Sequence, residues 1–183
     1  TRAVELLLSD DVNQAAELAI ELCEINYQRQ KEENKIAEEA YQKIEKHLDV
    51  SSQKVSVVED DEWMQGVVGI VSSKVTDKYG LPSILISFDG ASEGEASGLD
   101  IGKGSGRSIK GFNLVEALAY SKDTLVKFGG HELAAGLSIR RKDIPAFRDK
   151  INEYAESVLS EEDLYYTIEA DRELSFEDIT LNL

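Results

Sequence analysis

Two polar, glycine-rich segments carry the residue types best suited to binding an anion. Residues 102–108 read Gly-Lys-Gly-Ser-Gly-Arg-Ser, and residues 129–136 read Gly-Gly-His-Glu-Leu-Ala-Ala-Gly. Glycine lets a backbone approach a ligand closely because it has no Cβ. Lys103 and Arg107 can give phosphate charge-assisted hydrogen bonds, and Ser105 and Ser108 add hydroxyl groups. The two segments are therefore predicted to form two halves of one anion site.

The glycine spacing in residues 102–108 excludes two common nucleotide-binding loops. A Walker loop needs four residues between its first glycine and Gly-Lys-Ser/Thr. The third glycine also comes too early for a dinucleotide-binding fingerprint. The segment is expected to be a flexible loop, with residues 104–108 as a further candidate strand. By itself the pattern is weak, because a Gly/Ser loop is more often a surface turn.

His131 is one of only two histidines. Three roles are open to it: a metal ligand, a buried histidine with a satisfied hydrogen bond, or a hydrogen-bond donor to phosphate. His47 falls within a predicted helix and no carboxylate cluster lies near His131 in sequence, which disfavours a metal. The flanking Gly129 and Gly130 favour exposure to a ligand, so the phosphate role is preferred.

The charge distribution supports an anion-binding role for the same segments. The chain has a formal net charge of −16, which argues against nonspecific nucleic-acid binding by the whole surface. Residues 102–142, however, carry 8 basic and 3 acidic side chains, whereas each of the other parts of the chain is net acidic. Basic residues thus coincide with both glycine motifs, as expected for a nucleic-acid contact.

No hydrolytic centre is evident in the sequence. Asp60-Asp61 and Glu161-Glu162 are poor candidates for a two-metal site, because they fall in predicted turns without histidines at ligand spacing. No Ser/His/Asp or Cys/His arrangement is recognisable. Trp63 is expected to cover an edge of the core, and Phe112 could stack on a base or lie in the core. The chain is therefore predicted to bind phosphate without cleaving it.

Composition indicates a globular protein with a substantial core. The chain has 183 residues, of which 42% are hydrophobic, and no apolar run approaches the length of a membrane span. Cys23 is the only cysteine, which favours a reducing, cytoplasmic compartment. The chain begins at Thr1 without a methionine, so it is expected to be a piece of a longer protein.

Residues 10–48 are predicted to form one long helix, capped by Asp10 or Asp11. Apolar residues recur at helical spacing in both halves, but residues 28–35 are almost wholly polar. A helix of this length would span about 60 Å. Its polar middle could not be buried in a small core, so it is expected to bridge two bodies. A coiled coil is disfavoured because the heptad pattern is broken.

A compact α/β unit is expected after this helix. Buried or half-buried strands are predicted at residues 55–58, 83–88 and 137–140, with a further candidate at 95–99. Helices are predicted at residues 67–78, 114–120, 124–128 and 144–159, with Gly80 ending the first of them. A weak alternation at residues 165–170 predicts the first strand of another domain.

Three motifs in order resemble one known family. They are WMQGVVGIVSS (63–73), GKGSGRSIKGFNL (102–114) and FGGHELAAG (128–136). Together they resemble the DHHA1 domain of the RecJ single-stranded-DNA exonucleases, in the DHH phosphoesterase superfamily. The resemblance implies an α/β fold with a mixed sheet flanked by helices and preceded by a long interdomain helix. It implies a connecting helix over residues 1–50, a DHHA1 domain over 51–160 and the start of an OB-type domain over 161–183.

The resemblance also implies a function. The family degrades single-stranded DNA from the 5′ end with two divalent metal ions, Mn²⁺ or Mg²⁺, held by Asp and His residues of an N-terminal DHH domain. This chain has no Asp-His-His motif, so the fragment alone is expected to hold no metal and to be inactive. It would be the substrate-binding portion of an exonuclease of DNA repair and recombination. Candidate partners are single-stranded DNA, a single-strand-binding protein and a helicase, with no membrane.

The site residues follow from the motifs. By resemblance, Arg107 and Ser108 contact DNA phosphates, with Lys103 and Ser105 in the same segment. Gly129, Gly130 and His131 match the motif that binds the phosphate near the scissile bond, where His131 is a candidate to polarise it. One departure is Met64, where the family often has histidine, which puts any role for that position in doubt.

Two alternatives stay open. One is a related phosphodiesterase that cleaves very short RNAs or cyclic dinucleotides, which the long helix and the extra C-terminal strand disfavour. The other is a non-catalytic scaffold of a replication complex that kept the fold and lost the metal ligands. Intact Asp and His ligands in the sequence upstream would favour the enzyme.

Overall fold

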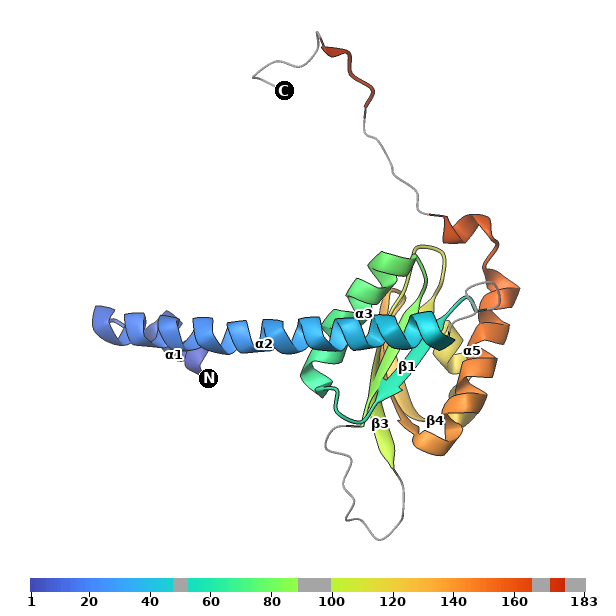
Figure 1. Cartoon of the computed structure of the whole chain (residues 1–183), viewed down its shortest axis with the longest axis horizontal. Coiled ribbons are helices and arrows are strands. Elements are labelled where there is room, and N and C mark those ends of the chain that lie inside the picture. Colours follow the sequence, from blue (N-terminus) through green and yellow to red (C-terminus); the bar gives the residue numbers. More distant parts are fainter. Residues whose placement is uncertain (48–52, 89–99, 166–171, 177–183) are drawn as a thin grey trace.

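A five-stranded mixed sheet with helices on both faces forms the body of the protein, and one long helix runs past it (Figure 1). The computed structural model describes residues 1–47, 53–88, 100–165 and 172–176. The helices are α1 (Arg2–Leu8), α2 (Val12–His47), α3 (Gln65–Tyr79), α4 (Leu114–Tyr120) and α5 (Ile144–Val158), and the strands are β1 (Ser56–Asp60), β2 (Ser83–Ser87), β3 (Ile101–Arg107), β4 (Leu125–His131) and β5 (Ala134–Arg140).

The strand order in the sheet is β1-β2-β3-β5-β4. β1 and β2 are parallel and are joined through α3, whereas every other neighbouring pair is antiparallel. β5 therefore lies between β3 and β4. The second glycine motif spans the end of β4 and the start of β5, so its residues 134–136 pair with β3, whereas Gly129, Gly130 and His131 on β4 do not. This architecture confirms the predicted α/β mixed sheet flanked by helices and preceded by a long helix.

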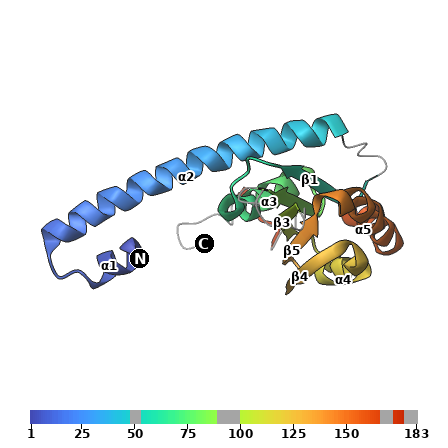
Figure 2. The ribbon, with the colours of Figure 1, turned by 90° about the horizontal axis from the view of Figure 1, so that it is seen from below.

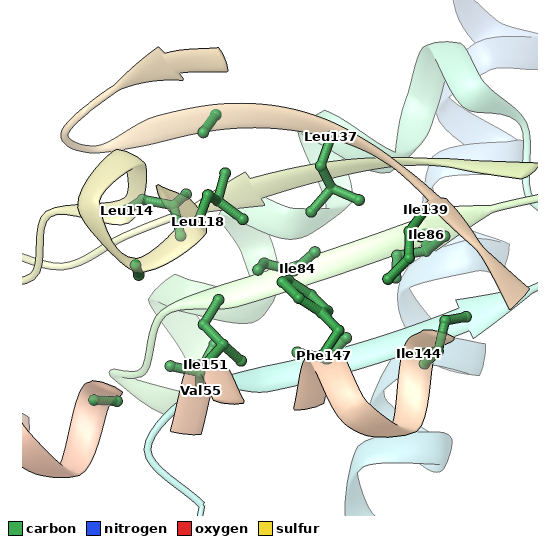
Figure 3. Close-up of a cluster of buried hydrophobic side chains, with 14 of the residues drawn as sticks. Val55, Ile84, Ile86, Leu114, Leu118, Leu137, Ile139, Ile144, Phe147 and Ile151 are labelled. Atoms are coloured by element: carbon green, nitrogen blue, oxygen red, sulfur yellow. The ribbon is translucent and has the colours of Figure 1, made fainter. Parts of the chain in front are cut away.

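The larger core lies between the sheet and the helices α4 and α5. Figure 3 shows side chains from several strands pointing toward those of both helices, with Ile84 and Phe147 near the centre. Phe112 belongs to this core and is fully buried, so it is not free to stack on a base. Asn113 caps α4 by accepting hydrogen bonds from the backbone N–H groups of Val115 and Glu116.

The second core lies on the opposite face, between the sheet and the helices α2 and α3. It contains Ile36, Ala40 and Ile44 of α2, and Trp63 is fully buried in it. The Trp63 indole Nε1 donates to Glu39 Oε2 at 2.9 Å. Trp63 is therefore a core residue, as the sequence predicted. Gly80 ends α3 in the left-handed conformation, with φ at 67°.

The predicted flexible loop at residues 102–108 is wrong, because this segment forms most of strand β3, whereas the candidate strand at 104–108 is confirmed to within a few residues. Its three glycines face the larger core and its polar residues face the other way. A Cβ at Gly102 would lie 2.8 Å from the Phe88 ring, and one at Gly106 would lie 2.9 Å from Leu114 Cδ2. Glycine is present here because the core leaves no room for a side chain.

The predicted helix at residues 124–128 is also wrong. Thr124 ends the short 3₁₀ helix Lys122–Thr124, and β4 begins at Leu125. From Lys127 onward every residue pairs with β5. Val126 and Phe128 suit a strand, and pairing with β5 outweighs the helical spacing of a short apolar run. The expected helices at 67–78, 114–120 and 144–159 and the strands at 55–58, 83–88 and 137–140 are confirmed to within a few residues.

Helix α2 extends well beyond the sheet, as predicted for residues 10–48. Figure 2 shows its N-terminal half and α1 reaching away from the body, on the side of α3 and away from α4 and α5. Asp11 caps α2 by accepting hydrogen bonds from the N–H groups of Asn13 and Gln14. Among the described residues, no helix combines the length and apolar character needed to span a bilayer. The predicted strands at 95–99 and 165–170 lie wholly or largely outside the described residues, and the predicted domain boundaries stay predictions.

One polar residue of α2 is buried against the body. Glu33, in the polar middle of the helix, is only 8% exposed. Its carboxylate pairs with Lys74 Nζ of α3 at 2.7 Å and accepts from Arg29 Nη1 at 2.6 Å. The hydrogen bond from Lys74 lowers the pKa of Glu33, burial opposes the shift, and Arg29 adds to the lowering. An ion-pair network therefore fixes this part of α2 on α3.

We expect Glu33→Gln to reduce the free energy of unfolding by about 1 kcal/mol, because it removes both ion pairs. The loss is small because Lys74 and Arg29 are partly exposed, and water screens their charges. The contribution of the Glu33 carboxylate is fully present above the pKa of an unfolded glutamate, about 4.3, and is lost as pH falls through the lower folded pKa. Urea denaturation near pH 7 and at successively lower pH measures both effects. The matched control is Glu38→Gln, at an exposed position of the same helix. Equal losses for the two variants would contradict this role.

Candidate nucleic-acid interface

The described helices leave about half of the sheet uncovered on the side of α3. Helix α3 packs on β2 and β3, and Gly69 of α3 lies against Ser105. Beyond β3, none of the described helices packs on the same side of β5 and β4 (Figure 2). Residues paired across antiparallel strands point to the same side of a sheet, so the pairing gives nine residues, which we term the open face, in three rows: Arg107, Ala134 and His131; Ser105, Gly136 and Gly129; and Lys103, Ser138 and Lys127.

The first row brings the two predicted half-sites together. Arg107 on β3 pairs with Ala134 on β5, and Ala134 pairs with His131 on β4. Neighbouring strands are about 4.8 Å apart, so the Cα atoms of Arg107 and His131 lie about 10 Å apart, with a small side chain between them. A phosphate above Ala134 could receive hydrogen bonds from both. The His131 side chain is exposed.

The second row is the floor of the open face. Ser105 pairs with Gly136, which pairs with Gly129. A Cβ at Gly129 would meet no atom within 4 Å, so the space above this backbone is open. Small residues keep the floor low, and a ligand can approach the strands closely here.

The third row carries two lysines. Lys103 pairs with Ser138, which pairs with Lys127. Sequence reasoning singled out Lys103 but missed Ser138 and Lys127. A helical prediction for 124–128 hid the alternation Lys127, Gly129, His131, which as a strand pattern would have placed these residues on one face.

Arg107 lies close to its own strand and keeps donors free. Its Nη1 donates to the Gly106 carbonyl at 2.9 Å and to Ser105 Oγ at 3.3 Å. A Cβ at Gly69 would lie 3.0 Å from Ser105 Oγ and 3.6 Å from Arg107 Nη2. Gly69 thus lets α3 pass beside Arg107 without displacing it. A guanidinium has five N–H donors, so most of them can reach an anion.

Ser108 lies one residue beyond β3 and outside the three rows. Its hydroxyl donates to the Phe112 carbonyl at 2.7 Å, and its N–H donates to the Leu133 carbonyl at 3.0 Å. The second bond ties β3 to the turn of the β4–β5 hairpin. Ser108 therefore holds that turn in place, and its predicted contact with phosphate stays a prediction.

Gly130 shapes the end of the same hairpin. Its φ is 153°, and a Cβ there would lie 2.4 Å from the Ala134 carbonyl oxygen and 2.5 Å from Ala135 Cα. Both atoms belong to the backbone and cannot yield without moving the strand. Gly129 and Gly130 thus have different roles: Gly129 keeps the open face clear, and Gly130 allows the hairpin to close.

The open face is electropositive within an acidic protein. Among the described residues, neither Arg107, Lys103 nor Lys127 forms an ion pair with an acidic side chain, although the chain has 36 acidic and 20 basic residues. None of the nine residues of the open face is acidic. Cations left without partners beside small, open residues are the arrangement expected for a polyanion site.

A separate, acidic hollow lies on the side of α2. Its volume is about 420 Å³ and its lining consists of Glu39, Lys43, Glu59, Asp60, Asp61, Glu62 and Arg141. Lys43 pairs with Asp60 at 2.8 Å, and Arg141 pairs with Asp61. Among the described residues, no group of three His, Cys, Asp or Glu side chains is placed to hold a metal ion. The described residues therefore do not fit a catalytic metal centre.

Comparison with known proteins gives the family. The model of the DHHA1 domain matches residues 52–157. The chain belongs to the DHHA1 domain family. All three rows of the open face lie within the part of the chain that matches this DHHA1 model.

Several relatives of this DHHA1 chain bear the same name. The single-stranded-DNA-specific exonuclease RecJ of Bacillus subtilis is 43% identical over 98% of this chain and 22% of that protein. RecJ of Escherichia coli is 34% identical over 98% of this chain and 31% of that protein. A crystal structure of RecJ from Thermus thermophilus in complex with Mg²⁺ has a TM-score of 0.71 at 31% identity, covering 85% of this chain and 22% of that one. The chain thus spans less than a third of the length of these relatives.

Neighbouring glycines in the DHHA1 domain should respond differently to the same substitution. We expect Gly130→Ala to reduce the free energy of unfolding by at least 2 kcal/mol, because the new methyl group would collide with backbone atoms in a conformation disfavoured for alanine. Gly129→Ala is the control, and it should change stability by less than about 1 kcal/mol because its Cβ meets open space. Urea denaturation followed by circular dichroism measures both. Equal stability of the two variants would contradict this assignment of the hairpin.

Proposed function

We propose that this chain is the substrate-binding portion of a 5′→3′ single-stranded-DNA exonuclease that acts in DNA repair and recombination. The observation that carries the proposal is the row of Arg107 and His131 on an open, cationic face of an otherwise acidic protein. The shared name of the relatives, single-stranded-DNA-specific exonuclease, supports single-stranded DNA as the proposed substrate class.

In this proposal the first row holds one DNA phosphate. The Arg107 guanidinium binds two of its oxygens in a fork, as arginine does with phosphate. His131 donates a hydrogen bond from the other side. This bond stabilises the negative charge that develops on the phosphoryl oxygens during hydrolysis. The glycine floor lets the sugar-phosphate chain lie close to the strands. The acidic remainder of the surface repels DNA and restricts it to the open face.

Cleavage in this proposal requires residues outside the chain. Two crystal structures of Thermus thermophilus RecJ that resemble this chain are complexes with Mg²⁺ and with Mn²⁺. We assign the metal ligands to a DHH domain that precedes this region in the full-length protein. The metal ion would supply Lewis-acid activation of the phosphodiester. The residues of this chain would bind and orient the DNA. The isolated chain would be inactive.

Two features of the cellular setting belong to the same proposal. We infer a cytoplasmic location, since the only cysteine, Cys23, is exposed and free. A single-strand-binding protein and a helicase are the candidate protein partners, because an exonuclease of this kind needs exposed single strands. The experiment below addresses the DNA contact on which both inferences depend.

We expect Arg107→Ala to weaken binding of 5′-phosphorylated single-stranded DNA by about tenfold, because it removes charge-assisted hydrogen bonds worth about 1.5 kcal/mol or more. His131→Ala should weaken it by a smaller factor. Fluorescence anisotropy at low salt measures both, with circular dichroism to confirm folding. Lys46→Ala is the control, because this exposed lysine lies on α2, beside the opposite edge of the sheet from β4. Unchanged affinity in both site variants would contradict the proposal and favour a scaffold role.

A further inference from the structure

We propose that the third row of the open face, Lys103, Ser138 and Lys127, binds a second phosphate of the same DNA strand. This phosphate lies two nucleotides along from the phosphate in the row of Arg107 and His131. The inference rests on the proposed function. It adds a second binding subsite and a path for the DNA strand that runs along the β-strands, from the first row to the third. Lys127 becomes a phosphate-binding residue that neither motif indicates.

The pairing register brings the two lysines together. Lys103 and Lys127 stand on either side of Ser138, on the same side of the sheet, and their Cα atoms are about 10 Å apart by strand spacing. Both side chains are exposed and long enough to converge above Ser138. The Ser138 hydroxyl has no hydrogen-bond partner among the described residues and faces the same space.

Electrostatics favours an anion at this place. Neither Lys103 nor Lys127 has an ion pair among the described residues. Five other lysines of the body have acidic partners, namely Lys43, Lys54, Lys74, Lys78 and Lys150, whereas no ion pair is formed by Lys122 or Lys142 among the described residues. Two like charges that face one another repel, and a phosphate between them would replace the repulsion with two attractions.

The spacing of the rows sets the distance between the two phosphates. Successive rows are two residues apart, or about 6.8 Å, so the first and third rows are about 14 Å apart. Phosphates in a duplex strand advance about 3.4 Å per nucleotide along the axis, and a strand with unstacked bases advances further. If the strand is extended to about twice the duplex rise per nucleotide, about 14 Å corresponds to two nucleotides.

The row between them leaves room for the part of the DNA strand that joins the two bound phosphates. Ser105, Gly136 and Gly129 carry no charge, and the space above Gly129 is open. Small residues would let a sugar or base lie flat between the two charged rows. The open face thus has the order cationic, small, cationic along the β-strands, so charge-assisted contacts are expected at the first and third phosphates and not at the phosphate between them.

Oligonucleotide length tests this subsite on the 183-residue chain. Unlabelled 5′-phosphorylated oligothymidylates of two and six nucleotides would displace a labelled hexanucleotide at low salt. We expect Lys127→Gln to weaken the hexanucleotide about three- to fivefold, as for a surface ionic contact, and to leave the dinucleotide unchanged, because the dinucleotide cannot reach both rows. Lys103→Gln should behave in the same way, and Arg107→Gln should weaken both lengths.

A neutral methylphosphonate placed at one linkage at a time locates the contact. At one position of the hexanucleotide it should cancel the effect of Lys127→Gln, and that position should lie two linkages from the one that cancels the effect of Arg107→Gln. The slope of log affinity against log salt should also fall in magnitude by about 0.7 in Lys127→Gln. Lys46→Gln is the matched control and should show none of these effects.

Failure of the second subsite and failure of the proposed function would give different results. Unchanged hexanucleotide binding in Lys127→Gln, or equal weakening of both lengths, would overturn the second subsite while the loss in Arg107→Gln still supports the proposed function. If Arg107→Gln has no effect and Lys127→Gln does, the proposed first subsite fails and the strand path with it. Absence of binding to every oligonucleotide would overturn both.

Discussion

Strand β3 has room for side chains on one face only, and the rest of the site depends on this constraint. Gly102, Gly104 and Gly106 lie against Phe88, Leu137 and Leu114, where an added Cβ would come within 3 Å of a core atom. Because strand residues alternate between faces, this close packing directs Lys103, Ser105 and Arg107 to the open face. A slip of one residue would place three polar side chains in the core. The core thus determines which residues of β3 lie on the open face.

The sequence predicted the parts whose pattern is local. The long helix, α3, the buried strand β2 and α5 all show periodicity or end signals in their own residues, such as Gly80 after α3. Strand β3 was predicted only in part: residues 104–108 were a candidate strand, but three glycines and a lysine favour a loop, and the packing of Phe88 and Leu137 against these glycines favours the strand. The helix predicted at 124–128 failed for a related reason: the strand state of β4 comes from its partner β5, which follows it in sequence.

The candidate site shows the same division. Arg107 and His131 were evident from residue types and from the resemblance to the DHHA1 family. Their placement in one row was not, because it requires knowledge that β5 lies between their strands. Ser108 illustrates the opposite case: its motif suggested a ligand contact, whereas its hydroxyl bonds the Phe112 carbonyl and its N–H bonds the hairpin turn. Motif membership therefore does not separate residues on the open face from residues whose hydrogen bonds hold the hairpin turn in place.

The insertion of β5 between β3 and β4 has a consequence for folding. Neither motif forms the interface by itself. The rows exist only while residues 134–140 of β5 pair with β3 on one side and with β4 on the other. On a chain emerging from the ribosome, β3 with Arg107 would be synthesised while the interface is still absent. The interface would form only when β5 enters the sheet between β3 and β4. In the finished protein, a local opening that releases this one strand would dissolve the whole interface at once, while the pairing of β1 with β2 beneath α3 remains.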